Sequence, residues 1–361
     1  MIVIVGAGPV GCFLGGLLAK AGKEVAIYEE HSKIGEPVQC TGIITKEIEK
    51  IIKLDKSFLV NSVDKVRVYS KRAKVEAPVN DIVIDRTKFD RYLAKKAKEN
   101  GAKIYLNHKF IGIRGGSAVF ADKKNKIKKV EAEVIIGADG PLSEVAKAND
   151  MFKGRKFYFG MQARVRRNFD VKVYETYFGS IAPGFFAWIL PESSKIARIG
   201  IAAKKETKEL FKRFLDIKKI DKKKIIDYQA GLIPIFNKSI EVKKGNVYLV
   251  GDAAGQVKAT TGGGLVPGMK AAKILADCLI YEKDYEKELK KLKRELWIHL
   301  RLRKGLDNFS NNEYDGLIKK IGSDKLKKVL NRVNRDNPKN LVFQAIKAKP
   351  NLLKYSIKFI N

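Results

Sequence analysis

Three apolar runs along the chain each end on a glycine-rich turn. Residues 2–5 are all aliphatic and lead into Gly6-Ala7-Gly8-Pro9-Val10-Gly11, after which a mostly apolar stretch continues to Ala21. Residues 134–136 and 247–250 repeat the pattern and end on Gly-Ala-Asp-Gly and on Gly-Asp-Ala-Ala-Gly. Short, wholly apolar runs are consistent with strands buried on both faces of a parallel sheet. The pattern therefore predicts three such strands, whose ends converge on one long ligand.

The first turn has the spacing G-x-G-x-x-G and opens a helix. Gly6 permits the sharp turn, Gly8 lets a pyrophosphate approach the backbone, and Gly11 lets the helix pack on the strand. A second strand at residues 24–30 carries Glu29, 18 residues after Gly11, where a carboxylate can accept hydrogen bonds from ribose hydroxyls. A strand, a glycine turn, a helix and a closing acid together predict a dinucleotide site rather than a merely glycine-rich turn.

The remaining pattern predicts an α/β fold: a Rossmann-like three-layer domain with an inserted antiparallel β-sheet substrate domain and a C-terminal helical region. The expected segments of the nucleotide domain are 1–62, 87–155 and 241–283, with inserted strands at 63–86, the substrate domain at 156–240 and the helical region at 284–361. The individual expectations are a helix at 45–54, short strands at 66–69 and 82–85, a helix at 88–100 capped by Thr87, strands at 103–113, 157–165, 173–178, 185–190 and 196–202, a hairpin through 119–130, and a helix from the Gly262 to Gly264 turn to about 280.

Composition limits the chemistry. With 361 residues and 45% hydrophobic content, the chain can bury a large core. Its three cysteines are widely spaced, which fits a reducing compartment, and its three histidines lie far from one another and from the cysteines. We therefore expect no metal. Residues 1–19 carry no charge, but they lack a basic leader segment and contain five glycines and a proline, so we interpret them as buried core of a soluble, cytoplasmic protein.

The chain has a formal net charge of +33. Such a field attracts polyanions, either nucleic acid or an anionic membrane surface, although a lysine-rich set of solvated faces explains it equally well. The densest basic run, residues 204–224, alternates with apolar residues as an amphipathic helix would, and is a candidate membrane-facing surface. No motif that reads nucleic acid is present.

These residues together resemble the flavoprotein fold of para-hydroxybenzoate hydroxylase and, within it, the geranylgeranyl reductase family. The specific matches are Pro37-Val38-Gln39-Cys40, the Gly251 to Gly255 turn with Gly262 to Gly264, and the segment Pro183 to Pro191, which is similar to the family's Y-x-W-x-F-P motif. In that motif the tyrosine is replaced by Phe186 and the phenylalanine by Leu190.

The resemblance implies an FAD-dependent oxidoreductase that acts on CH-CH groups, with FAD as the cofactor. It implies that Cys40 is catalytic and lies beside the flavin, whereas the residues alone also allow a small buried thiol there. It implies that Phe186 and Trp188 contact the substrate. The implied FAD-binding residues are Gly6, Gly8, Val10, Gly11, Glu29, Cys40, Thr41, Ile43, Arg91, Asp252, Gly264 and Leu265.

The implied reaction is saturation of isoprenoid C=C bonds of geranylgeranyl chains, in archaeal-type membrane lipids, at a membrane surface to which the protein binds peripherally. The partners would be an isoprenoid lipid and an external electron donor. No second G-x-G-x-x-G marks a nicotinamide site, so the donor can be a nicotinamide, a deazaflavin, ferredoxin or an artificial reductant. The acceptor can be a phospholipid, a diphosphate or a free alcohol. The alternatives are an FAD-dependent monooxygenase of the same fold and a nucleic-acid-binding flavoprotein.

Overall fold

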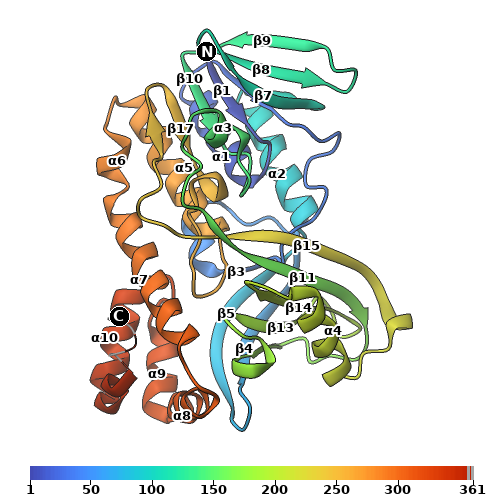
Figure 1. The fold of residues 1–361 in the computed structure, drawn as a ribbon, viewed down its shortest axis with the longest axis vertical. Coiled ribbons are helices and arrows are strands. Elements are labelled where there is room, and N and C mark those ends of the chain that lie inside the picture. The colour runs from blue at the N-terminus through green and yellow to red at the C-terminus, as the bar shows by residue number, and fades with distance from the viewer. Residues whose placement is uncertain (356–357, 359–361) are drawn as a thin grey trace. The chain divides into compact units, whose positions relative to one another are not determined.

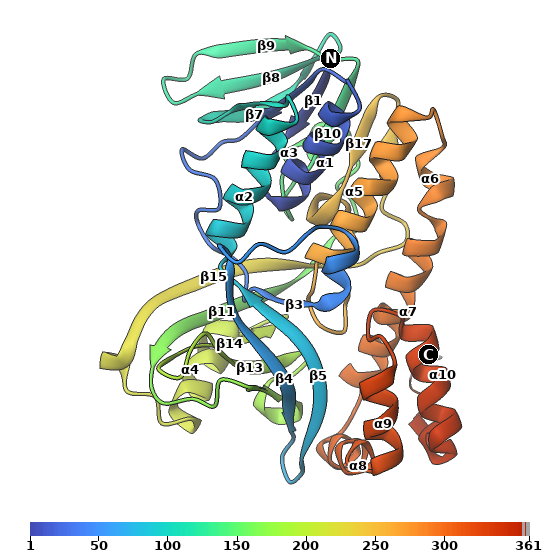
Figure 2. The ribbon, with the colours of Figure 1, turned by 180° about the vertical axis from the view of Figure 1, so that it is seen from behind.

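The computed structural model describes residues 1–355 and Lys358. Its chain divides into two compact units. Unit 1 comprises residues 1–38, 85–156 and 234–297, and unit 2 comprises residues 39–84, 157–233 and 298–361. Figures 1 and 2 show their elements from two opposite sides. Residues 39–62 thus group with unit 2 and residues 284–297 with unit 1, which differs from the segments expected from the sequence.

A six-stranded sheet forms the centre of unit 1. All its strands pair in parallel except β16, which is antiparallel at one edge. In spatial order the strands are β16 (Lys243–Lys244), β17 (Val247–Leu249), β10 (Val134–Gly137), β1 (Ile2–Val5), β2 (Val25–Tyr28) and β6 (Lys103–Tyr105). Because β1, β10 and β17 are parallel neighbours, the three glycine-rich turns that follow them lie at one edge of the sheet, as the sequence pattern predicts.

Alternating side chains of β2 show how both faces of this sheet are covered. Ile27 faces α1, since a Cβ added to Gly15 of that helix would lie 2.6 Å from Cδ1 of Ile27. Tyr28 points to the other face, where its ring stacks on Phe120 with centroids 4.1 Å apart. Phe120 belongs to a small antiparallel sheet, so unit 1 has three layers. The further elements of unit 1 are α1 (Pro9–Lys20), α2 (Arg86–Glu99), α3 (Glu144–Ala148), η4 (Gly251–Ala254), α5 (Leu265–Ile280) and α6 (Tyr285–Glu288), with β7 (His108–Arg114), β8 (Ser117–Asp122) and β9 (Ile127–Glu131) in the small sheet.

Unit 2 is built on an eight-stranded sheet. In it β12 pairs in parallel with β4, whereas the pairs β11–β14, β12–β13, β13–β14, β3–β5 and β4–β5 are antiparallel. In spatial order its strands are β15 (Ile225–Ile235), β11 (Lys156–Arg166), β14 (Ile196–Ala203), β13 (Phe186–Pro191), β12 (Val173–Tyr177), β4 (Leu59–Tyr69), β5 (Lys74–Ile84) and β3 (Ile43–Thr45). The strand β3 pairs with β5, which explains why residues after 38 belong to this unit. The observed layers confirm the predicted α/β class with an inserted sheet.

The helices α8 (Asn311–Ile321) and α9 (Asp324–Arg332) pack on the hairpin of β4 and β5. Asp315 on α8 accepts hydrogen bonds from the Ser70 hydroxyl and, at 3.0 Å, from the Arg72 amide. Arg335 forms an ion pair with Asp81 of β5. The helices of this region are α7 (Lys290–Asp307), α8 (Asn311–Ile321), α9 (Asp324–Arg332), α10 (Pro338–Ala348) and η5 (Pro350–Tyr355).

Two local predictions are wrong. The helix expected at 45–54 is a short strand followed by the single-turn η1 (Lys46–Lys50), because pairing with β5 holds the chain extended up to Thr45. The cap of α2 is Asp85, whose carboxylate accepts from the Lys88 amide at 3.0 Å. The Thr87 hydroxyl instead donates to the Gly35 carbonyl at 3.1 Å. In addition, the short strand expected at 66–69 is part of the long strand β4, and the one expected at 82–85 is the end of β5, which stops at Ile84.

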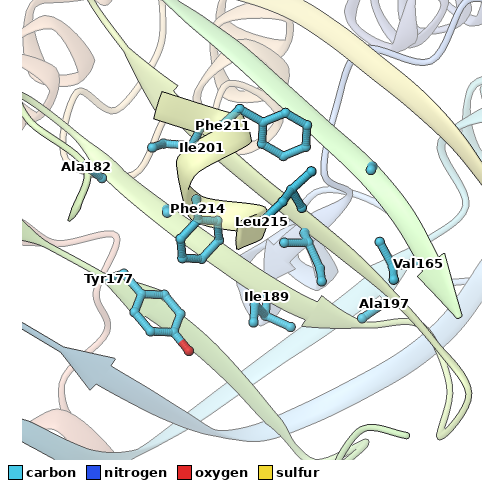
Figure 3. Close-up of a cluster of buried hydrophobic side chains, with 12 residues drawn as sticks. Val165, Tyr177, Ala182, Ile189, Ala197, Ile201, Phe211, Phe214 and Leu215 are labelled. Atoms are coloured by element: carbon cyan, nitrogen blue, oxygen red, sulfur yellow. The ribbon is translucent and has the colours of Figure 1, made fainter. Parts of the chain in front are cut away.

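The helix α4 (Thr207–Ile217) covers one face of the sheet of unit 2. Its Phe211, Phe214 and Leu215 are buried against strand residues such as Ile189 and Ile201 (Figure 3). An apolar face buried in this way cannot lie on a membrane. The membrane-facing surface predicted for residues 204–224 therefore cannot be formed by Phe211, Phe214 and Leu215.

Replacement of Phe214 by Ala should lower the free energy of unfolding by roughly 3–5 kcal/mol, because the ring is fully buried and its loss leaves a cavity. The exposed Lys212 of the same helix is the control, and Lys212→Ala should change stability by no more than about 0.5 kcal/mol. Urea unfolding followed by circular dichroism measures both. Equal transition midpoints for the two variants would contradict the packing described here.

Candidate active site

The first glycine turn is shaped by close backbone approach. Gly6 has a φ of +102°, and a Cβ at that position would lie 2.4 Å from the Ala138 carbonyl oxygen. A Cβ on Gly11 would lie 2.1 Å from the carbonyl oxygen of Gly6. In contrast, a Cβ on Gly8 would meet no atom within 4 Å. Gly6 and Gly11 are therefore required by packing, whereas Gly8 leaves open space where the predicted pyrophosphate would approach.

Two long helices of unit 1 begin without a side-chain cap, namely α1 after Gly8 and α5 after Gly264. Val10 at the start of α1 connects them: a Cβ on Gly268 of α5 would lie 2.9 Å from Cγ2 of Val10, and one on Gly251 would lie 3.3 Å from its side chain. The first turns of the two helices are thus packed together. Uncapped amides and the helix dipoles favour an anion at such a place.

Glu29 closes the turn from the end of β2. One carboxylate oxygen accepts from the Ala7 amide at 2.8 Å and the other accepts from the His31 amide at 2.9 Å. The His31 ring also contacts this second oxygen, with Nδ1 2.6 Å from Oε1. Because a carboxylate has about four acceptor positions, these three contacts orient it and leave capacity for a ribose hydroxyl. Glu29 is therefore fixed against the glycine turn, where the sequence predicts the ribose.

Asp252 follows β17 and lies against the N-terminus of α5, since a Cβ on Gly264 would be 2.7 Å from its Oδ1. Burial raises the pKa of Asp252 to about 6, and the nearby Arg86 guanidinium acts in the opposite direction. This carboxyl group is thus poised to accept or donate a hydrogen bond near neutral pH. Leu265, the other residue expected here, is the first residue of α5.

Arg91 on α2 holds the loop that leaves β2. Its Nη2 donates to Glu36 at 2.6 Å and its Nε donates to the Ile34 carbonyl at 3.2 Å. Half of the Arg91 side chain is exposed, so the guanidinium can also contact a ligand. The residues of unit 1 fit FAD: an open glycine turn, two uncapped helix N-termini, an oriented acid and an arginine.

The remaining expected residues belong to unit 2. Gly42 has a φ of +75°, and a Cβ there would lie 2.4 Å from the Arg198 guanidinium and 2.6 Å from the Ile84 carbonyl. The Gly42 amide donates to the Cys40 sulfur at 3.3 Å. Glycine is therefore required at position 42, and the resulting turn sets the place of the Cys40 thiol. The next residue, Ile43, is partly buried and begins β3.

Arg198 fixes this loop to the sheet. It donates to the Thr41 carbonyl and, at 3.1 Å, to the Ile84 carbonyl, and it forms an ion pair with Glu192 at 2.6 Å. Burial opposes the ionised form of Glu192, but Arg164 and Arg198 together hold its pKa below the usual value. The ion pair with Glu192 and the hydrogen bonds to the two carbonyls orient Arg198 toward the loop.

Gln162 on β11, which no sequence motif marks, links the loop of Cys40 and Thr41 to Trp188 of the Pro183–Pro191 motif. Its Oε1 accepts from the Thr41 hydroxyl at 2.9 Å and from the Trp188 indole at 3.3 Å, while its Nε2 donates to the Cys40 carbonyl at 3.3 Å. Trp188 fits because Gly200 on the neighbouring strand has no side chain; a Cβ there would lie 2.4 Å from the indole. The sequence offers no signal for this role beyond a single amide in a strand that also contains three basic residues.

Phe186 lies in an array of aromatic rings within unit 2. Its ring is 4.4 Å from Phe185, 5.6 Å from Phe178 and 5.8 Å from Trp188 between centroids. The array continues through Phe178 to Tyr314 at 5.8 Å. The structure thus brings Cys40, Thr41 and Trp188 together through one network and surrounds Phe186 with apolar rings.

Within residues 1–355 and Lys358, no three His, Cys, Asp or Glu side chains gather as a metal ion would need. In the same part of the chain, no helix has both the length and the apolar character needed to cross a bilayer.

Two matched substitutions test the glycine turn. Gly8→Ala should leave the stability of the FAD-free protein nearly unchanged, because the added methyl group meets open space and the φ of −67° suits alanine, but it should weaken FAD binding. Gly11→Ala should destabilise the FAD-free protein itself, since the methyl group would overlap the Gly6 carbonyl. Thermal unfolding without FAD and fluorescence titration with FAD separate the two effects. Unchanged FAD affinity in Gly8→Ala would contradict this assignment.

Comparison with known proteins agrees with this geometry. Residues 1–284 match the family described as FAD binding domain. Digeranylgeranylglycerophospholipid reductase 3 of Methanosphaera stadtmanae is 30% identical over 317 residues, which cover 80% of this chain and 79% of the relative. Digeranylgeranylglycerophospholipid reductase of Methanocaldococcus jannaschii is 28% identical, with 98% and 96% covered.

Among solved structures, a geranylgeranyl bacteriochlorophyll reductase-like protein of Thermoplasma acidophilum superposes with a TM-score of 0.87 at 23% identity, covering 99% of this chain and 98% of that one. This likeness confirms the fold. The family matches and the FAD-shaped features of unit 1 together show that the chain is an FAD-dependent oxidoreductase of the geranylgeranyl reductase family.

Proposed function

We propose that this enzyme saturates C=C bonds of geranylgeranyl chains in archaeal-type membrane lipids. The observation that carries the proposal is a hydrogen-bond network in unit 2. Through Gln162 it joins the loop of Cys40 and Thr41, called the thiol loop, to Trp188 of the aromatic motif Pro183–Pro191. Support comes from the two relatives named as digeranylgeranylglycerophospholipid reductases, which match most of the chain. The cysteine and the aromatic rings around Phe186 offer a largely apolar surface, which suits an apolar substrate better than a polar one.

An isolated trisubstituted alkene is difficult to reduce because no carbonyl group polarises it. When bound, reduced FAD supplies the hydride. The protein must then provide a proton, exclude water, and stabilise cationic character that develops at the tertiary carbon. The faces of Trp188 and Phe186 can stabilise such charge in an apolar environment.

Cys40 is the proposed proton donor. It is partly exposed, whereas the other two cysteines, Cys12 and Cys278, are buried. Burial raises the pKa of both buried thiols. The Gly42 amide, which donates to the Cys40 sulfur, would stabilise the thiolate that remains after proton transfer. A water molecule that relays the proton to the substrate is the alternative route.

Anaerobic single-turnover oxidation of the reduced enzyme by a geranylgeranyl lipid tests the function, with the product identified by mass spectrometry. The wild-type protein should yield a saturated bond. Cys40→Ser should slow this step by roughly 100-fold or more, the loss associated with a general acid, and Cys40→Ala should be no faster. FAD should remain bound in both variants, and Cys278→Ala, which changes a buried thiol in α5, is the control.

Near wild-type rates in both Cys40 variants would end the assignment of this residue. Oxygen consumption in proportion to a hydroxylated product would instead identify the enzyme as a monooxygenase.

A lipid substrate also requires access to a membrane. The segment 211–228 exposes the large apolar side chains Ile217, Ile226 and Tyr228 beside six exposed basic residues and two exposed acidic residues. The exposed basic residues are Lys212, Arg213, Lys219, Lys222, Lys223 and Lys224. We propose that this segment, rather than the buried face of α4, binds an anionic membrane surface, with lysines at the headgroups and apolar side chains among the acyl chains.

Replacing Lys222, Lys223 and Lys224 together by Ala should weaken sedimentation with phosphatidylglycerol vesicles by roughly 100-fold, at about 1 kcal/mol per lysine. The control removes three exposed lysines from α2, namely Lys95, Lys96 and Lys98, and thus has the same net charge. Equal losses in both variants would show that only net charge matters. Tight RNA binding at physiological salt without vesicle binding would favour a nucleic-acid partner instead.

A further inference from the structure

Gln162 is a buried amide whose orientation is fixed by its partners. Its side chain is 5% exposed, so an unmade hydrogen bond there would be costly. The indole of Trp188 can only donate, so the amide oxygen must face it, together with the Thr41 hydroxyl. The NH2 group must therefore face the Cys40 carbonyl and Gln229, to which it donates at 2.6 Å.

The consequence is that one side chain on β11 fixes two separate elements, the Cys40–Thr41 loop and the Trp188 ring. On one side, Gln162 and Arg198 hold the successive carbonyls of Cys40 and Thr41, which leaves the thiol loop little freedom to rotate. On the other side, Gln162 fixes the rotation of the Trp188 ring through its only polar atom. A change at Gln162 would therefore shift the thiol and the indole relative to each other.

We propose that Gln162 is a positioning residue that sets the Cys40 thiol and the Trp188 ring in the arrangement needed for alkene reduction. This inference rests on the proposed function. A misplacement of about 1 Å at a reacting group can cost roughly 100-fold in rate, so the expected loss is in kcat rather than KM. Gln162 acts through Cys40 and Trp188 and does not itself touch the reacting atoms.

The test uses the FAD-loaded enzyme with Gln162→Met, which keeps the length of the side chain and removes every hydrogen bond. Single-turnover alkene reduction should fall by roughly 10–100-fold with FAD affinity unchanged. Alkylation of Cys40 by iodoacetamide should become several-fold faster than in the wild type, measured on the Cys40 peptide by mass spectrometry. The matched control is Gln344→Met in α10.

A double variant separates positioning from general damage. If Gln162 acts through the thiol, Gln162→Met should slow the reaction by less than about 3-fold when Cys40 is already Ala, because effects within one network are not additive. A full additional loss in the Cys40→Ala background, or an unchanged alkylation rate, would overturn the proposal. Should Gln162→Met fail to fold, Thr41→Val removes one bond of the same network and should shift alkylation and turnover in the same direction.

The alkylation measurement does not depend on the reaction. If the wild-type enzyme reduces no geranylgeranyl lipid, the proposed function fails while faster Cys40 alkylation in Gln162→Met still supports positioning. If the wild type is active and Gln162→Met matches it in the rates of alkene reduction and of Cys40 alkylation, Gln162 has no positioning role, while the proposed function stands.

Discussion

Close approach of the backbone at a few glycines is the constraint on which both groups of candidate residues depend. In unit 1, α1 can begin against the Gly6 carbonyl only because Gly11 has no side chain. In unit 2, the guanidinium of Arg198 reaches the thiol loop only because Gly42 leaves room for it. In both units the space is used by a polar group, the Gly6 carbonyl in one case and the Arg198 guanidinium in the other. The functional features thus follow from where side chains are missing.

The sequence predicts unit 1 well because its chemistry is local. Gly6, Gly8, Gly11 and Glu29 lie within thirty residues, and each acts through a turn or a strand end that has its own pattern. Gln162 could not be found in this way, since the Cys40 carbonyl that it binds is 122 residues away in the chain. An isolated glutamine in a strand carries no information about its partner. The sequence therefore predicts the motifs, but not the contacts that join them.

The helix α4 illustrates a second limit. Its pattern of lysines and apolar residues is the same whether a membrane or a protein sheet covers the apolar side. The structure resolves this ambiguity, because Phe211 and Phe214 complete the core of unit 2. Periodicity shows that one face of a helix is apolar. Which layer covers that face depends on the spatial order of the strands, and the sequence pattern does not give that order. The strand β15 is not predicted from the sequence for a different reason, because its mixed polar and apolar residues follow no clear strand pattern.

The contacts between the last helices and the hairpin of β4 and β5 affect how the protein is made. Asp315 binds Ser70 and Arg335 binds Asp81, so residues separated by about 250 positions complete the same part of unit 2. During translation the hairpin leaves the ribosome long before Asp315 and Arg335 are made, so the surface that they contact stays uncovered over that time. Unit 2 can therefore reach its final packing only after residue 335 has been synthesised. Until then the uncovered hairpin is exposed to non-native pairing with other chains, and the arrival of the helices from α8 onward ends that period.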